Sequence, residues 1–150
     1  MTSCSVEDLI MNSLSLSSDA VTVLGLAGTA LPFAQSVDDE IERWLRPLRL
    51  YGESGRALQA LGVGEVPPPS SVHASSKTSE TTPAETLHIV TVTAAEIASE
   101  RGVTSVGTQD ILIAVMRHYG GDFETVLQAR STDGAELMDR LLGHAGSAAQ

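Results

Sequence analysis

The sequence predicts an all-α fold of two pseudo-repeated helical bundles, and three observations support this prediction. Hydrophobic residues form 42% of the 150-residue chain, whereas aromatic residues form only 3%. This composition favours helices packed through Leu, Val, Ile and Ala over an aromatic-rich β-sandwich. Apolar residues also recur at helical spacing in both halves of the chain. Between these halves lies a tract rich in proline, serine and threonine, residues 65–83.

This tract begins with three consecutive prolines and cannot bury a core, so we expect it to be a disordered linker. It separates an N-terminal helical half, residues 1–64, from a C-terminal repeat, residues 84–143. Residues 144–150 are expected to form a tail.

The C-terminal half is expected to contain four helices. The first covers about 84–101 and stops at Gly102. Thr108 is expected to cap the second, with Asp110 in the first turn, where the helix dipole favours negative charge. Gly120 follows its last turn. The predicted inward face of this second helix comprises Ile111, Leu112, Val115, Met116 and Tyr119.

Two shorter patterns complete the C-terminal half. A third helix is expected after Asp122, with Phe123 on its apolar side. Asp133 and Glu136 have the spacing of a capping box ahead of a fourth helix, which Gly143 is expected to close.

The N-terminal half repeats this pattern in part. Ser-Val, Tyr-Gly and Leu-Gln-Ala occur in the same order in both halves, at offsets of 69, 68 and 69 residues. This agreement favours an ancient duplication. Pro47 is expected to kink or end a helix near Arg46, while "ALQALGV" predicts a helix that stops at Gly62. An additional amphipathic stretch, Ser5–Leu14, is expected to replace the fourth helix that the first half lacks.

Charge and cysteine content exclude several classes of protein. Nine basic residues against 19 acidic residues give a net charge of -10. Such a surface repels phosphate groups, so neither nucleic acid nor an anionic membrane is an expected partner. The single cysteine, Cys4, permits no internal disulfide, and the first residues lack the basic charge of a signal peptide. We therefore expect a soluble, cytoplasmic protein.

No motif predicts a catalytic set, a metal site or a cofactor. "GESG" (Gly52–Gly55) lacks the final glycine of a nucleophile elbow, so we interpret it as a turn and helix cap. "GLAG" (Gly25–Gly28) lacks the lysine of a phosphate loop and is interpreted as small residues that let two helices approach closely. The four histidines have no metal-ligand spacing. An enzyme is the least favoured function.

Trp44, the only tryptophan, has two interpretations. Core packing is favoured because aromatic side chains bury large areas. The alternative places Trp44, Tyr51 and Tyr119 around an apolar groove between the two halves, with Leu48 beside them. Peptides and macrocycles bind to surfaces of this kind.

The segment "SVGTQDILIAVM", residues 105–116, resembles the Clp N-terminal repeat. That repeat forms the substrate-receiving domain of Clp-type AAA+ unfoldases. Residues 123–127 and 135–142 are similar to its two later helices. The resemblance implies a Clp N-domain-like fold that captures a peptide or protein segment, as an adaptor or decoy, with a Clp protease component as a partner. The chain itself carries no Walker A motif.

One departure from the family concerns its phosphoarginine site. Where the family has Glu-His after Gly-Thr, this chain has Gln109 and Asp110. In some members that glutamate and a threonine bind phosphoarginine, and the position of the threonine is Ala84 here. Both changes remove charge-assisted or polar contacts to a guanidinium group.

Six residues are candidates for ligand binding, and two classes of ligand fit them. The first is a peptide or protein segment. The second is an antibiotic-like macrocycle, which the protein would sequester in self-resistance or in a natural-product pathway. A homodimer is a further arrangement that the sequence leaves open. The candidate residues are Trp44, Leu48, Tyr51, Thr108, Gln109 and Tyr119.

Free phosphoarginine is expected to bind weakly or not at all, because the anchoring groups of the family are missing. The double variant Gln109→Glu, Ala84→Thr restores the family pattern and is expected to bind more tightly in isothermal titration calorimetry. Tight binding by the unaltered chain would show that these two positions do not form the site.

Overall fold

The computed structural model describes residues 15–62, 81–130 and 132–148, with side chains described as far as Leu141. The expected helix at Ser5–Leu14 lies outside these residues, as does most of the expected linker. Within them the fold is all-α, as predicted, with seven α-helices and a single pair of two-residue strands.

The elements follow one another along the chain with short connections. The helices are α2 (Ser18–Ala30), α3 (Val37–Leu50), α4 (Gly52–Ala60), α5 (Pro83–Glu100), α6 (Thr108–Tyr119), α7 (Gly121–Ala129) and α8 (Gly134–Ala148), with a 3-10 helix, η1 (Leu31–Phe33), after α2. The strands β1 (Ser15–Leu16) and β2 (Ser105–Val106) pair in parallel, with Ser15 opposite Ser105. This pairing joins the segment before α2 to the loop before α6.

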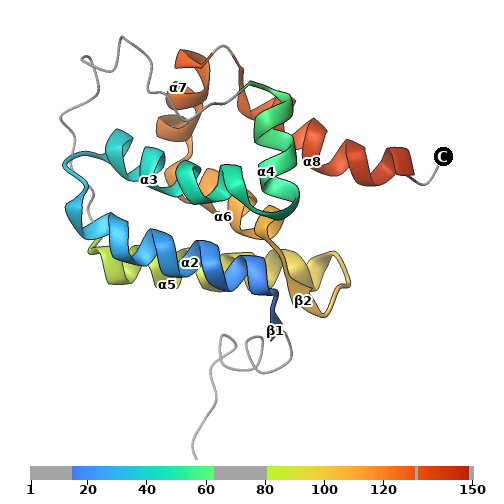
Figure 1. Cartoon of the computed structure of the whole chain (residues 1–150), viewed down its shortest axis with the longest axis horizontal. Coiled ribbons are helices and arrows are strands. Elements are labelled where there is room, and N and C mark those ends of the chain that lie inside the picture. Colours follow the sequence, from blue (N-terminus) through green and yellow to red (C-terminus); the bar gives the residue numbers. More distant parts are fainter. Residues whose placement is uncertain (1–14, 63–80, 131, 149–150) are drawn as a thin grey trace, which may run out of the picture.

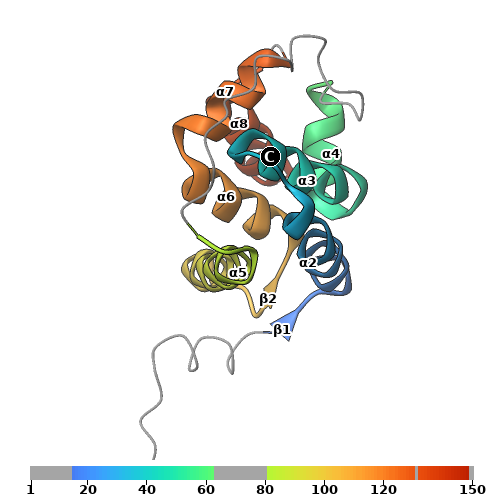
Figure 2. The ribbon, with the colours of Figure 1, turned by 90° about the vertical axis from the view of Figure 1, so that its left-hand side faces the viewer.

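The helices form layers, and each layer contains one helix from each half of the chain. Helices α2 and α5 lie side by side in one layer (Figure 1), and α3 and α6 lie over them. Helices α4 and α7 lie beyond α3 and α6 (Figure 2), and α8 contacts α4, α6 and α7. Among the described helices, none is both long and apolar enough to cross a membrane.

Helix α6 is the centre of this arrangement. It contacts each of the other six α-helices of the described chain. Every residue from Thr108 to Val115 is buried, including Ile113 and Ala114, which the sequence pattern did not place on the inward face. The prediction of a single inward face is therefore wrong for the first two turns, because neighbouring helices surround them. A helix covered on all sides is a core helix.

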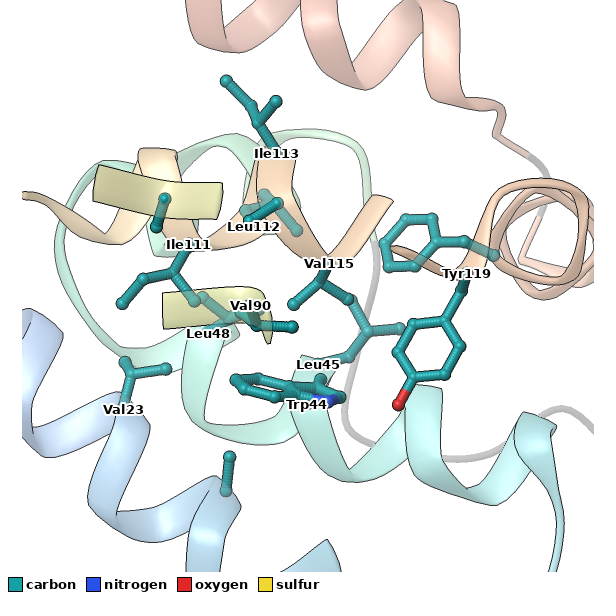
Figure 3. Close-up of a cluster of buried hydrophobic side chains, with 14 of the residues drawn as sticks. Val23, Trp44, Leu45, Leu48, Val90, Ile111, Leu112, Ile113, Val115 and Tyr119 are labelled. Carbon is teal, nitrogen blue, oxygen red and sulfur yellow. The ribbon is translucent and has the colours of Figure 1, made fainter. Parts of the chain in front are cut away.

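Both halves contribute to one hydrophobic core. Close to α6, Trp44 and Leu48 from α3 meet Ile111, as Figure 3 shows, together with Val23 from α2 and Val90 from α5. The halves are therefore not independent bundles. Their repeat origin stays a prediction, although α4 and α7 are both nine-residue helices in corresponding places.

Side-chain caps fix the starts of α2, α3, α5 and α8. Ser17, Ser36 and Thr82 each accept a hydrogen bond of 3.1 Å from the backbone N–H three residues later. Asp133 does the same for Glu136 at 2.8 Å, which confirms the predicted start of α8. Each such cap satisfies an N–H that the helix itself leaves unpaired.

Glycines mark three of the predicted helix stops, and one of them is Gly120, which directly follows α6 with a φ angle of 56°. Gly62 and Gly102 have φ angles of 79° and 77°, a left-handed conformation that favours glycine, directly beyond α4 and α5. The expected stop at Gly143 is wrong, since α8 continues to Ala148. A glycine inside a helix weakens it without ending it.

Pro47 does not end α3. The helix continues to Leu50, and Pro47 is itself buried. Helix α4 stabilises this last turn, because Ser54 Oγ donates to the Leu48 carbonyl (2.7 Å) and Gln59 Nε2 donates to the Arg49 carbonyl (2.7 Å). Tertiary contacts therefore outweigh the hydrogen bond that proline removes.

Replacing Gly52 by alanine is expected to destabilise the fold more than the same change at Gly62. Both glycines have a positive φ, so each substitution costs about 1–2 kcal/mol in backbone conformation. A Cβ at Gly52 would also lie 2.4 Å from Thr108 Oγ1, whereas a Cβ at Gly62 meets nothing within 4 Å. Urea unfolding of both variants measures the difference, and equal losses would show that the contact between α4 and α6 relaxes.

Candidate functional site

The structure buries almost all of the residues that the sequence suggested for ligand binding. Trp44 and Leu48 have no exposed surface, and the exposed fractions of Thr108, Tyr119 and Gln109 are only 3%, 8% and 9%. The core interpretation of Trp44 therefore fits the structure, and Trp44 cannot line an open groove in it. Of the six candidates, only Tyr51 keeps an intermediate exposure.

Trp44 and Tyr119 belong to a polar connection inside the core. The Tyr119 hydroxyl donates to Glu40 Oε1 at 2.7 Å, which joins α6 to α3. The indole nitrogen of Trp44 faces this hydroxyl (Figure 3), but the contact lacks the geometry of a full hydrogen bond. Burial, followed by the bond to the Glu40 carboxylate, strongly raises the pKa of Tyr119, and the Trp44 contact opposes this shift.

Thr108 and its neighbours form a second, separate group at the start of α6. Gly107 occupies the cap position, so the prediction that Thr108 caps this helix is wrong. Thr108 is instead the first helical residue, and its Oγ1 accepts a hydrogen bond from the Ser54 N–H at 3.3 Å. The first turn of α4, which begins at Gly52, thus packs directly against α6. All of "GESG" lies inside this helix and Tyr51 occupies its cap position, so the interpretation of these residues as a turn and helix cap is wrong.

Asp110, in the first turn of α6, binds the backbone at the N-terminus of its own helix. Its carboxylate is fully buried and accepts a hydrogen bond from the Gly107 N–H at 2.9 Å. The Nε and Nη2 atoms of Arg101 donate to its two oxygens, each at 2.8 Å. These bonds raise the pKa of Arg101, which therefore stays charged. Because a buried carboxylate needs such partners, Asp110 is engaged within the fold.

The described residues contain no group of three or more His, Cys, Asp or Glu side chains that could hold a metal ion. What the described surface does offer is one basic region in an acidic chain. Residues 43–56 contain four arginines and a single acidic residue, whereas the whole chain has a net charge of -10.

We call the outer side of the second half of α3 the basic face. Ile41, Trp44 and Leu48 point into the core, so the residues on the opposite side share one outer face. Arg46 is exposed, and 56% of the Leu50 side chain is exposed. The basic face comprises Arg43, Arg46, Arg49 and Leu50, and Arg56 on the outer side of α4 follows it in sequence.

Part of this charge stabilises α3 itself. Its first turn holds three acidic residues and its last turn holds Arg49, which suits the helix dipole. Arg43 also pairs with Asp39 at 3.3 Å. Neither explanation covers Arg46, Arg56 or the exposure of Leu50. The net charge of the chain hides this face, whereas the spacing of "RWLRPLRL" places Arg43, Arg46 and Arg49 on one side of a helix.

No protein-family model matches the chain, and none of the curated proteins is similar to it at a significant level. The resemblance to the Clp N-terminal repeat therefore rests on the motifs described above and stays a prediction.

The Tyr119→Phe variant is expected to lose about 1–2 kcal/mol of stability at neutral pH, because Glu40 loses its hydrogen-bond donor. The folded state raises the pKa of Tyr119 above its ordinary value near 10, so above pH 10 the unfolded chain releases this proton more readily. The free energy of unfolding of the unaltered chain should then fall by up to about 1.4 kcal/mol per pH unit more steeply than that of the variant.

Chemical unfolding between neutral pH and pH 11 tests this expectation. Tyr51→Phe is the matched control, since Tyr51 is the only other tyrosine. The same alkaline slope in the unaltered chain and in Tyr119→Phe would contradict the proposed role of Tyr119.

Proposed function

We propose that this chain is a non-catalytic binding module of the Clp N-terminal type. It captures a protein segment in which an apolar side chain lies next to acidic residues, and the basic face is its binding surface. The observation that carries this proposal is the exposed Leu50 on the same side of α3 as Arg46, in a chain that is otherwise strongly acidic.

The chemistry of the basic face defines the partner. Covering an exposed leucine with an apolar side chain lowers the free energy of the complex, because apolar surface leaves water. Arginine guanidinium groups bind carboxylates through paired hydrogen bonds, which favours Asp and Glu beside that apolar residue. The net charge of -10 opposes the approach of acidic segments, so this surface discriminates by local pairing and not by long-range attraction.

The resemblance to the Clp N-terminal repeat supports the class of the module. A domain that receives segments of other proteins needs an accessible surface and no catalytic group. An adaptor would pass the captured segment to a Clp protease component, whereas a decoy would withhold it, and both roles begin with the same capture step. Macrocycle sequestration depended on an open aromatic groove, and the burial of Trp44 removes its support.

Arg46→Glu is expected to weaken binding of an acidic, leucine-containing peptide by about tenfold or more, the size of effect expected for a central charged contact. Arg140→Glu is the matched control. Arg140 is exposed on α8, and both variants change the net charge equally, so long-range repulsion of the peptide increases by the same amount in each.

Fluorescence anisotropy with a dye-labelled peptide measures both affinities. A second peptide, with lysine in place of each acidic residue, tests the sign of the recognised charge. Preference for the lysine peptide, or equal losses in Arg46→Glu and Arg140→Glu, would contradict the proposed site.

A further inference from the structure

Helix α2 has an outer face without any charged residue. After Asp19, no charged residue occurs until Asp38. We define the α2 face as Val21, Thr22, Gly25, Leu26 and Thr29, on the side of α2 opposite its buried residues, together with Phe33 in η1.

The α2 face exposes large apolar side chains. Exposed fractions are 53% for Val21, 44% for Leu26 and 70% for Phe33. The polar groups between them are already engaged, since the Thr22 hydroxyl donates to the Ser18 carbonyl (3.0 Å) and the Thr29 hydroxyl to the Leu26 carbonyl (2.9 Å). The face therefore offers water few free hydrogen-bond donors, and covering it would release apolar surface from water.

Gly25 lies in the middle of this face, and nothing in the part of the chain that the structure describes requires a glycine there. A Cβ at Gly25 would meet no atom within 4 Å, and an exposed helical glycine is less stable than alanine. Gly28 differs, because a Cβ there would lie 3.2 Å from Leu87 Cδ2, where α2 packs on α5. The sequence interpretation of "GLAG" thus accounts for Gly28 within the chain and leaves Gly25 open for close approach by another backbone.

Charge restricts what can cover the α2 face. The face has no group that would pair with a charged partner, and neither α2 nor α5 contains a lysine or arginine. A matching surface must therefore be uncharged along one helix length. Elsewhere this chain carries its full charge of -10, so two copies repel each other except where such faces meet.

We propose that the α2 face is the interface of a homodimer, in which the α2 helices of two copies cross at Gly25 about a two-fold axis. An antiparallel crossing places each Asp19 at an opposite end, about 18 Å apart along the axis. This separation exceeds the Debye length of about 8 Å at physiological salt, whereas a parallel crossing would bring the two carboxylates together.

The dimer is expected to be reversible. A face along 13 residues of one helix is about 20 Å long and about 10 Å wide, so it covers roughly 200 Å². Standard interfaces bury about 800 Å² per partner. The interface is separate from the basic face, so this inference does not depend on the proposed function.

Sedimentation velocity over a hundredfold range of protein concentration tests the proposal. The unaltered chain should shift from monomer to dimer as concentration rises. Leu26→Glu should raise the dissociation constant by about tenfold or more, since it places like charges in a small interface. Leu50→Glu is the matched control, because it introduces the same charge at another exposed leucine outside the α2 face.

Gly25→Ala separates an interface role from a folding role. The added methyl group fits the monomer, so the melting temperature at low concentration should rise while dimerisation weakens. An unaltered chain that stays monomeric throughout, or a dimer that Leu50→Glu disrupts as much as Leu26→Glu does, would overturn the proposal. Because Leu50→Glu should abolish binding of the acidic peptide and spare the dimer, failure of one proposal is distinguishable from failure of the other.

Discussion

The complete burial of the first half of α6 is the constraint on which the rest of the structure depends. Six of the described helices cover α6, and the backbone N–H groups at its N-terminus need hydrogen-bond partners. Asp110 supplies one such partner, because its carboxylate accepts a hydrogen bond from the Gly107 N–H. Arg101 balances the negative charge of this carboxylate. The loop before α6 is therefore held by charge, whereas the body of the helix is held by apolar packing.

Local signals in the sequence predicted the helical fold and several of the helix ends, because capping side chains and left-handed glycines act over a few residues. Two helix ends differ from the sequence prediction: α3 does not end near Arg46, and Thr108 is not the cap of α6. At Pro47 the decisive hydrogen bonds come from α4, and at Thr108 they come from Asp110 and from Ser54. Only the bond between Ser54 and Thr108 joins distant segments, 54 residues apart. The other bonds are local, but they depend on side-chain geometry that helical spacing does not describe.

Helical spacing alone also did not identify which residues of the candidate site are accessible. Aromatic residues attracted attention because they dominate many binding surfaces, yet a chain with so few of them uses Trp44 to fill its core. The accessible apolar side chains include Leu50, Leu26 and Phe33, whose exposure depends on which side of each element the neighbouring helices leave uncovered. Helical spacing groups such residues on a face, but it does not state which face is outermost.

The pairing of β1 with β2 has a consequence for the order in which the chain can fold during synthesis. Ser15 bonds to a carbonyl 89 residues later, and α2 to α4 contact a central helix that follows still further along the chain. At about 5–20 residues per second, a ribosome needs roughly 4 to 18 seconds to add that many residues. Until then the apolar sides of the first three helices have only one another to pack against, so the nascent N-terminal half depends on the solubility of its own surface or on chaperones.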